Sequence, residues 1–368
     1  MEFSEEKAIQ QLIDTYANSF QMLTKRILNS KIRGVDTYSD AQILASVNRN
    51  INKLLEENKK FVNLVIPKVY GRTREETLEF FKKHNIKVKA DATFREVHTE
   101  AVEELQKALN DDLKSGLLQI GRKSRDSLRE ISIEASKISA AGIGEQSAIN
   151  AAVKKISSLG LESITYKNGS KVGIKDYVKM ATRSTTSAAI NKATVNQMQE
   201  YDRNLVMLSY HSTSCPICSP FQGRVYSMKE DDNEFPHIGI INNGAIISYG
   251  IIHPNCRHRL LPYIPELDEK QAETKEVSNR SFEDNRTEWS KTRYKNRQKS
   301  SKCQREIDRL TEQNIILKSV NTQAAREQIT ENNKKIKQKI LQVKAIKKWE
   351  VDGLNDNELF TDILSKRT

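Results

Sequence analysis

Hydrophobic residues recur every three to four positions along residues 3–30, so that they fall on one side of a helix. This spacing predicts an amphipathic helix near the beginning of the sequence. A polar break follows at residues 31–40, and the helical spacing then resumes from Ile43 to about Val65. Pro67 is expected to end this second helix, because proline lacks the backbone N–H that a helix interior requires.

Two Thr-x-x-Glu sequences predict the starts of two further helices. This pattern forms a capping box, in which the threonine and glutamate side chains satisfy backbone N–H groups at a helix N-terminus. The first box, Thr73–Glu76, is expected to open a helix that ends near His84. The second, Thr93–Glu96, is expected to open a helix that continues with interruptions to about Ile156. Residues 1–158 are therefore predicted to form an N-terminal helical region.

The spacing of hydrophobic residues changes after these helices, where a central module over residues 159–266 is predicted. Residues 164–172 have the character of a β-hairpin around Asn168-Gly169, a pair that tolerates the positive φ angles of a tight turn. A helix is expected after Asp176, through about Met198, and residues 205–210 then have the composition of a β-strand. The module is therefore predicted to combine a helix with short strands.

Residues 267–368 are predicted to form a basic helical region at the C-terminal end. Apolar residues keep a helical spacing there, and three of them recur every seven positions. The pattern predicts either a short coiled coil or a helical hairpin, with Asn321 and Asn332-Asn333 as candidate breaks. The apolar positions are Ile307, Leu310, Leu317, Ile329, Ile336 and Val343.

The fold class predicted from these elements is α+β and mainly α.

The charge of the chain indicates a candidate partner. The chain has a formal net charge of +12. Residues 286–305 hold eight Lys or Arg against one acid, and residues 334–348 hold seven lysines and no acid. Such runs fit a polyanionic partner such as DNA. The alternative is that they are ordinary solvated helix faces, and the sequence leaves both open.

The apolar content indicates no membrane association. No apolar run approaches the ~20 residues of a membrane span. The N-terminus also lacks the apolar core of a secretory signal peptide. The four cysteines are few and clustered, which favours a reducing compartment and metal binding over disulfides.

Three of the four cysteines and four of the six histidines lie between Tyr210 and Pro262. Cys215 and Cys218 are separated by two residues, and His253 and Cys256 repeat this spacing about 35 residues later. Two ligands at this spacing can wrap a tight turn around one ion, and thiolates with a neutral imidazole suit zinc. These four residues are the predicted zinc ligands. The alternative is that the thiols are simply reduced and the histidines form hydrogen bonds in turns.

His258 and His211 are reserve ligands, because each lies within a few residues of a cysteine. The site is expected to be structural, since four protein ligands leave no open position for a water or substrate. The acids of this stretch lie together in a polar loop, residues 230–234, and none adjoins a ligand. The order typical of a nucleobase deaminase, His-x-Glu before a cysteine pair, is absent. Catalysis by a cysteine with His211 lacks an orienting partner, so no enzymatic activity is predicted.

Four short motifs follow one another along the central module. Residues 166–169 are aromatic-x-Asn-Gly, and residues 177–184 are Tyr-x-x-Met-x-x-Arg followed by Ser184. Residues 218–227 contain Gln-Gly-Arg-Val-Tyr-Ser, and residues 254–258 are Pro-Asn-Cys-Arg-His. This combination resembles the minor capsid proteins of tailed phages, in which threonine stands in place of Ser184. The Cys-Pro-x-Cys and His-Pro-x-Cys-Arg sequences also resemble the head-morphogenesis domain of Mu-like phages.

The resemblance covers about residues 160–310 and implies a structural protein of the phage head. Such proteins associate with the portal vertex and act in procapsid assembly, so portal protein and major capsid or scaffold proteins are the expected partners. The expected location is the virion head, and the host cytoplasm during assembly. Two other functions are kept as alternatives. They are an effector enzyme of ADP-ribosyltransferase or nuclease type carried in the head, and a zinc-stapled DNA-binding protein.

The resemblance also implies which residues of this chain stand at the ligand positions of the two motif variants. Cys215 and His253 match the head-morphogenesis variant of the motif. The residues that match the minor capsid motif are His211, Cys218, Cys256 and His258. The two variants therefore leave open which histidine completes the zinc site.

Overall fold

The computed structural model of the protein divides into two compact units, each built from several stretches of the chain. The first unit comprises Met1–Ser19, Val47–Lys123 and Glu162–Asn285, and the second comprises Phe20–Ser46, Ser124–Leu161 and Arg286–Thr368. The residues that the structure describes are 4–32, 40–88, 96–140, 163–165, 169, 171–242, 252–253, 256–284, 286–318 and 323–355.

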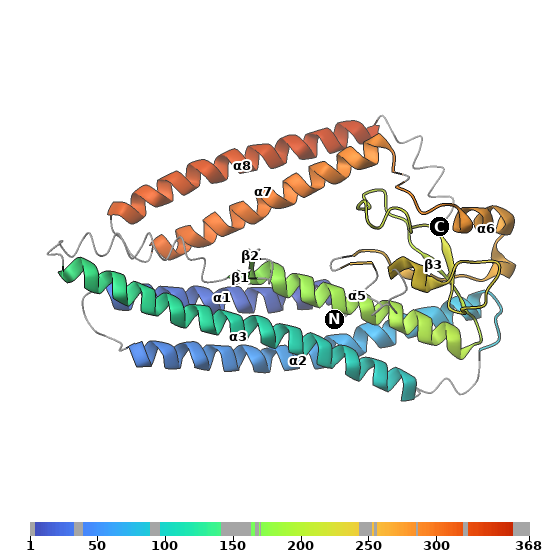
Figure 1. The fold of residues 1–368 in the computed structure, drawn as a ribbon, viewed down its shortest axis with the longest axis horizontal. Helices are drawn as coiled ribbons and strands as arrows, with labels where there is room; N and C mark the ends of the chain where they lie inside the picture. Colours follow the sequence, from blue (N-terminus) through green and yellow to red (C-terminus); the bar gives the residue numbers. More distant parts are fainter. Residues whose placement is uncertain are drawn as a thin grey trace. The chain divides into compact units, whose positions relative to one another are not determined.

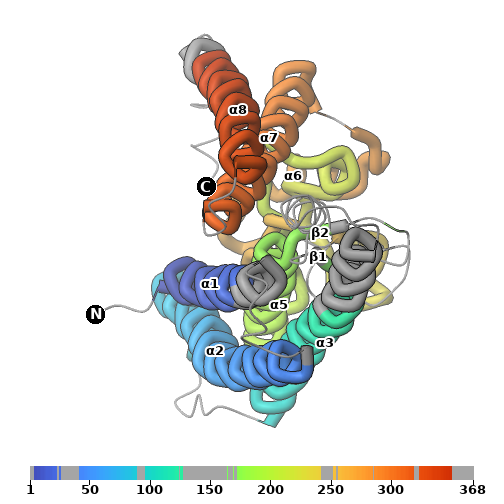
Figure 2. Tube along the Cα trace, turned by 90° about the vertical axis from the view of Figure 1, so that its left-hand side faces the viewer, coloured from blue at the N-terminus to red at the C-terminus, as the bar shows by residue number. Residues whose placement is uncertain are grey.

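Three long helices form most of the N-terminal part of the chain, as the hydrophobic spacing predicted. They are α1 (Glu5–Ile32), α2 (Asp40–Lys83) and α3 (Glu96–Ala140). Within the first unit they lie alongside α5 (Ile174–Glu200), as Figure 1 and Figure 2 show. The buried Tyr16 hydroxyl of α1 donates to Asn58 Oδ1 of α2 at 2.8 Å, and the Tyr177 hydroxyl of α5 donates to a backbone carbonyl of α3 at 2.9 Å. These long-range bonds fix the helices against one another.

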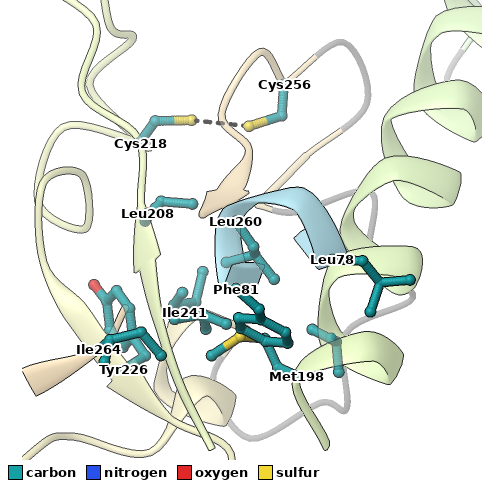
Figure 3. Close-up of a cluster of buried hydrophobic side chains, with 12 residues drawn as sticks. Leu78, Phe81, Met198, Leu208, Cys218, Tyr226, Ile241, Cys256, Leu260 and Ile264 are labelled. Carbon is teal, nitrogen blue, oxygen red and sulfur yellow. Dashed lines mark hydrogen bonds between the residues drawn. The ribbon is translucent and has the colours of Figure 1, made fainter. Parts of the chain in front are cut away.

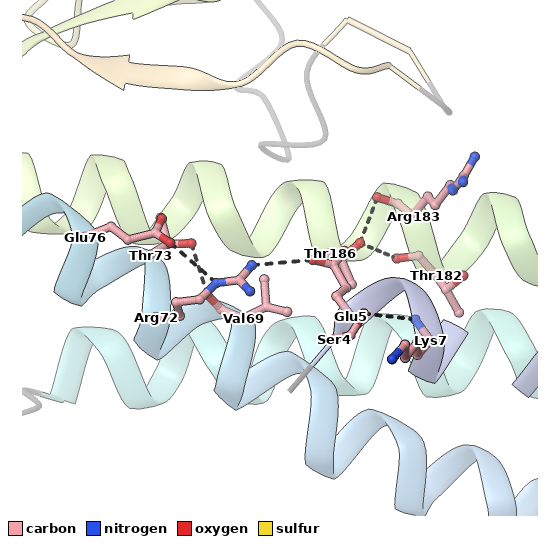
Figure 4. Close-up of polar contacts among 10 residues, drawn as sticks. All are labelled: Ser4, Glu5, Lys7, Val69, Arg72, Thr73, Glu76, Thr182, Arg183 and Thr186. Carbon is pink, nitrogen blue, oxygen red and sulfur yellow. Dashed lines mark hydrogen bonds and ion pairs between the residues drawn. The ribbon is translucent and has the colours of Figure 1, made fainter. Parts of the chain in front are cut away.

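Further polar contacts lie between and within the helices of this unit (Figure 4). Glu5 Oε2 in the first turn of α1 lies 3.7 Å from an Arg72 guanidinium nitrogen of α2. In α5, the buried Thr182 and Thr186 hydroxyls donate to carbonyls one turn earlier in the same helix, at 2.7 and 2.9 Å. Because these hydroxyls are satisfied within the helix, α5 can bury them at little cost.

The expected helix boundary at Pro67 is wrong, because α2 continues through this residue to Lys83. Proline inside a helix costs about 3 kcal/mol, since one backbone hydrogen bond is lost. Burial of the surrounding side chains offsets this cost, because each fully buried aliphatic or aromatic side chain contributes about 1.5–3 kcal/mol. The fully buried neighbours on α2 are Val62, Val65, Ile66, Val69 and Tyr70.

The capping box at Thr73–Glu76 is also wrong as a helix start. Thr73 lies inside α2, where its hydroxyl donates to the Val69 carbonyl at 3.0 Å instead of capping a new N-terminus. Thr93 of the second box lies outside the described residues, and α3 is described from Glu96. The predicted continuation of this helix beyond Ala140 also lies outside them, as does the polar break around Gly34.

The predicted β-hairpin is present at the start of the central module. β1 (Ser163–Thr165) and β2 (Lys171–Gly173) pair in antiparallel fashion, with Ile164 opposite Val172. Gly169 adopts a φ of +80°, as the turn prediction required, whereas Asn168 lies outside the described residues. The predicted helix follows as α5 and begins at Ile174.

A three-stranded antiparallel sheet with the order β4-β3-β5 forms the rest of the module. Its strands are β3 (Leu205–Leu208), β4 (Val225–Ser227) and β5 (Leu260–Pro262). Val206 of β3 lies opposite Tyr226 on one side and Pro262 on the other. The short helices η1 (Ile238–Asn242), η2 (Pro265–Leu267) and α6 (Gln271–Asn279) flank these strands in sequence.

A hydrophobic core joins this sheet to two of the long helices (Figure 3). Leu78 and Phe81 of α2 and Met198 of α5 pack against Val206 and Tyr226 of the sheet. The sulfurs of Cys218 and Cys256 lie at the edge of the same cluster, pointing toward each other. The core therefore anchors both halves of the candidate metal site.

The second unit contains a helical hairpin of α7 (Glu288–Lys318) and α8 (Gln323–Asn355), which lie side by side in Figure 1. Cys303 Sγ contacts Gln342 Oε1 at 3.3 Å, and Asn332 Nδ2 donates to Asn314 Oδ1 at 2.9 Å. Residues later in α7 therefore contact residues earlier in α8, so the two helices are antiparallel. The hairpin alternative of the sequence prediction is confirmed.

Asn332-Asn333 is wrong as a helix break, because both residues lie within α8. Asn332 is buried at 1% exposure and donates to Asn314 Oδ1, so its polar group is satisfied across the hairpin. Asn321, the other candidate break, lies outside the described residues. The α+β, mainly α fold class is confirmed, and no helix within the described ranges combines the length and apolar character needed to cross a bilayer. The division at residues 158 and 266 stays a prediction.

Candidate metal centre

The first pair of predicted ligands lies in a turn between β3 and β4. The backbone N–H of Cys218 lies 3.2 Å from the Cys215 carbonyl and 3.4 Å from Cys215 Sγ. The N–H of Ser219 donates to the same carbonyl at 3.0 Å. These bonds close a tight turn that holds both thiols close to His253. Cys218 is buried and Cys215 half-buried.

The second pair lies just before β5. The N–H of Cys256 donates to the His253 carbonyl at 3.0 Å, whereas Pro254 and Asn255 lie outside the described residues. Antiparallel pairing sets Leu208 at the end of β3 opposite Leu260 at the start of β5. The loop after β3 and the loop before β5 therefore meet at one end of the sheet.

The loops bring His253 into contact with both cysteines of the first pair. His253 Nε2 lies 3.2 Å from Cys215 Sγ and 3.1 Å from Cys218 Sγ. The ligand atoms of these three residues all lie within 4.8 Å of one another. They form a first donor group.

Cys218 also belongs to a second donor group with Cys256 and His258, and all three are buried. Cys218 Sγ lies 3.8 Å from Cys256 Sγ, and Cys256 Sγ lies 3.4 Å from His258 Nδ1. The structure therefore brings the four predicted ligands and the reserve His258 around the sulfur of Cys218.

His211, the other reserve ligand, belongs to neither group in the described part of the chain. Its Nε2 lies 3.1 Å from the Arg257 carbonyl and 3.3 Å from Ser209 Oγ. Its ring meets the His258 ring edge-on, with the centroids 4.8 Å apart. His211 thus packs beside the donor groups.

The thiols of Cys218 and Cys256 titrate as a pair. The pKa of Cys256 is lowered chiefly because its sulfur accepts a hydrogen bond from the Cys218 thiol. The pKa of Cys218 is raised by the same bond to Cys256 and by burial. A cation bound by both sulfurs requires both thiols to lose their protons, so metal binding and proton release are coupled.

The donor types and spacings fit a metal ion such as zinc. Two sulfurs on one tetrahedral zinc, with Zn–S near 2.3 Å, lie about 3.8 Å apart. The Cys218–Cys256 distance of 3.8 Å matches this value. The imidazole nitrogens lie 3.1 to 3.4 Å from the sulfurs, close to the roughly 3.5 Å that such a geometry requires. These groups are positioned to bind a metal.

Two acids of residues 230–234 make contacts that stabilise their loop. Asp232 Oδ1 accepts the backbone N–H groups of Glu234 and Phe235 at 2.8 and 3.0 Å, which closes their loop. Glu234 Oε1 pairs with Lys275 Nζ at 2.7 Å. These contacts show how two of the acids stabilise the loop and its link to α6.

Two buried residues near the site had no role assigned from sequence. Gln222 Oε1 accepts the His211 N–H at 2.9 Å and lies 3.0 Å from His258 Nε2. The Arg224 guanidinium donates to the Ser281 carbonyl at 2.8 Å and lies 4.3 Å over the Phe282 ring. The motif Gln-Gly-Arg-Val-Tyr-Ser was the signal for both residues, although spacing alone does not reveal their contacts.

Comparisons with known proteins bear on the family of the chain. A protein described as "Structural protein" from Lactococcus phage LL-H is 26% identical over 101 residues, which are 27% of this chain and 27% of that protein. The chain therefore matches about a quarter of that relative's length. No solved structure matches the chain. The family model described as "Phage minor capsid protein 2" matches residues 4–345, which include both donor groups and the helical hairpin. Since this match spans most of its length, the chain belongs to the phage minor capsid protein 2 family.

Proposed function

We propose that this phage structural protein acts in procapsid assembly at or near the portal vertex, and that it has no enzymatic role. The family match over residues 4–345 carries the proposal. The fold supports it, because long helices supply extended surfaces for protein contacts. The expected partners are portal protein and the major capsid or scaffold proteins, and the expected location is the virion head.

Purification of procapsids and mature heads from the phage that encodes the chain tests this function. We expect the chain to copurify with portal protein at a low, fixed number of copies per particle. Phage lacking the gene should give fewer filled heads, and supplying the gene in trans should restore them. Absence of the chain from both procapsids and heads contradicts the assembly role.

We further propose that zinc occupies the metal centre as a structural staple, held by Cys215, Cys218, His253 and Cys256. The support is geometric: the ion would tie the loop after β3 to the loop before β5. Zinc with four protein ligands contributes folding energy and leaves no position open for catalysis. The buried surroundings of Cys218 and Cys256 favour such a role.

DNA is a second candidate partner, favoured by the charge of the α7–α8 hairpin. The two basic stretches, residues 286–305 and 334–348, run past each other where Cys303 contacts Gln342. Exposed lysines on α8 include Lys344, Lys347 and Lys348. Lysines gathered on one hairpin attract phosphates more strongly than scattered ones, because their fields add. We propose that this hairpin contacts packaged DNA.

A further inference from the structure

The metal centre offers one donor more than zinc needs. Zinc takes four ligands in a structural site. The two donor groups together supply three thiols and two imidazoles, all arranged around Cys218. His258 is the additional donor. The role of His258 depends on Gln222, which contacts its Nε2.

Gln222 has its side-chain oxygen fixed by the backbone. The N–H of His211 donates to Gln222 Oε1 at 2.9 Å, and a backbone N–H can only donate. The oxygen, and not the amide nitrogen, therefore faces this region. The same oxygen lies 3.0 Å from His258 Nε2, so this nitrogen must carry a hydrogen to form the bond.

The tautomer of His258 follows from this bond. A neutral imidazole carries one proton, so a hydrogen on Nε2 leaves Nδ1 with an available lone pair. Nδ1 lies 3.4 Å from Cys256 Sγ, within the second donor group. A lone pair cannot donate to a thiolate, but it can bind a cation. His258 is 3% exposed, so water has little access to it.

His258 is thus arranged as a metal ligand with its own supporting residue. Metal-binding histidines commonly donate their second N–H to an acceptor, which fixes the ring and makes the ligand more basic. Gln222 supplies that acceptor. His253 offers its Nε2 to the first group at 3.1 and 3.2 Å. Two imidazoles therefore approach the Cys218 sulfur from its two donor groups.

We propose that His253 and His258 are alternative ligands of one zinc ion, and that Gln222 is the positioning residue for His258. The thiolates of Cys215, Cys218 and Cys256 fill three positions, and either imidazole fills the fourth. The inference rests on the metal centre proposed above. It gives the centre two histidines for one position, so that zinc stays bound when either histidine is lost.

Metal content of four forms of the full chain tests the exchange: wild type, His253→Gln, His258→Gln and the double variant. We expect one zinc per chain in the wild type and in each single variant, and loss of zinc from the double variant during chelator competition. X-ray absorption should show three sulfurs and one nitrogen in both single variants. Loss of zinc from either single variant overturns the exchange, whereas a zinc-free wild type overturns the metal centre itself.

Gln222 is tested in the His253→Gln background, where only His258 remains. Gln222→Leu should lower zinc affinity about 10- to 100-fold there, the usual effect of removing such a support. Gln222→Glu keeps an acceptor oxygen and should restore the affinity. In the wild-type background Gln222→Leu should change affinity little, because His253 holds the position. An equal loss in both backgrounds, or no rescue by glutamate, contradicts the positioning role.

Discussion

Cys218 is the residue on which the proposed metal centre depends most, because its sulfur belongs to both donor groups. Its partner Cys256 reaches it from a loop 38 residues later. Cys303, by contrast, lies in the helical hairpin and contacts Gln342. The chain thus contains cysteines inside the centre and one outside it, which allows matched substitutions.

Cys256→Ser is expected to weaken zinc binding, so that the metal is lost during chelator competition, because it deletes the thiolate that the loop before β5 contributes. Elemental analysis after gel filtration measures the metal, and thermal unfolding followed by circular dichroism measures stability. Because binding of structural zinc is coupled to folding, the thermal unfolding transition of this variant should move to lower temperature. Removal of zinc from the wild type by a chelator should lower its unfolding temperature in the same way.

Cys303→Ser is the matched control and should retain the full zinc content. Full zinc in Cys256→Ser would remove this residue from the ligand set. Equal loss from both variants would show that the metal is bound nonspecifically by thiols.

The sequence was sufficient to single out residues that the structure brings together, but not their arrangement. Cys215, Cys218, His253 and Cys256 stand out because paired spacings of two residues are visible along one chain. The contact of Gln222 with His258 is invisible there, because it depends on the loop before β5 folding back across 36 residues. His211 illustrates the limit in the other direction: it is near the cysteines in sequence, yet a carbonyl and a hydroxyl occupy its Nε2.

At the scale of elements, Pro67 shows how tertiary burial overrides a local signal. The helix continues through it because the flanking residues of α2 are fully buried. Pro67→Ala would restore a backbone donor, and it would also loosen the unfolded chain slightly. We expect a net stabilisation of roughly 2 kcal/mol, measured by urea unfolding of the first unit within the full chain.

The control for this substitution is Glu75→Ala, at an exposed position of the same helix. It should leave stability nearly unchanged, because exposed surface substitutions usually stay within about 0.5 kcal/mol. A destabilised Pro67→Ala chain would show instead that the helix needs the geometry that proline imposes in order to pack.

The α7–α8 hairpin contains a polar contact that can fix its register. Asn332 donates to Asn314 Oδ1, and Asn314 donates to Asn333 Oδ1, each at 2.9 Å. Buried asparagines in paired helices set register at some cost in stability, because other alignments leave their amides unsatisfied. The apolar residues that repeat every seven positions in α8 would tolerate a shift by one repeat. The asparagines would not.

A disulfide can read out this register. Gln342→Cys should form a disulfide with Cys303 under mild oxidation, since Gln342 already contacts that sulfur. Replacing both Asn314 and Asn332 with leucine should preserve helicity but lower the yield of this disulfide, measured by mass mapping without reductant. Gln338→Cys, one turn away, is the control and should remain reduced. An unchanged yield in the leucine variant would show that other contacts set the register.

At the scale of the whole molecule, helical content and the order of elements were predictable because they follow from spacings of three, four and two residues. The assignment of residues to the two compact units was not predictable. The first unit joins residues from three separate stretches of the chain, and no local pattern marks Ser19 or Val47 as a boundary. The core that joins Phe81 of α2 to Tyr226 of β4 depends on contacts across more than a hundred positions, which periodicity does not encode.

The distribution of charge over the molecule leads to the last prediction, which concerns DNA. Lys344, Lys347 and Lys348 are exposed on α8, and Lys53, Lys59 and Lys60 are exposed on α2. Reversal of either trio to glutamate changes the net charge equally. Only the α8 trio lies within a run of lysines without acids, whereas Lys59 and Lys60 pair with neighbouring glutamates at 2.9 and 3.0 Å.

Binding of duplex DNA should therefore weaken much more in the α8 triple variant than in the α2 triple variant. Each phosphate contact adds about 0.9 to the slope of log affinity against log salt concentration, because bound cations release counterions. Fluorescence anisotropy across a salt series measures both affinity and slope. The α8 variant should have a shallower slope, with the α2 variant close to wild type. Equal losses in the two variants would mean that net charge alone attracts the DNA, and binding insensitive to salt would exclude a phosphate-contacting hairpin.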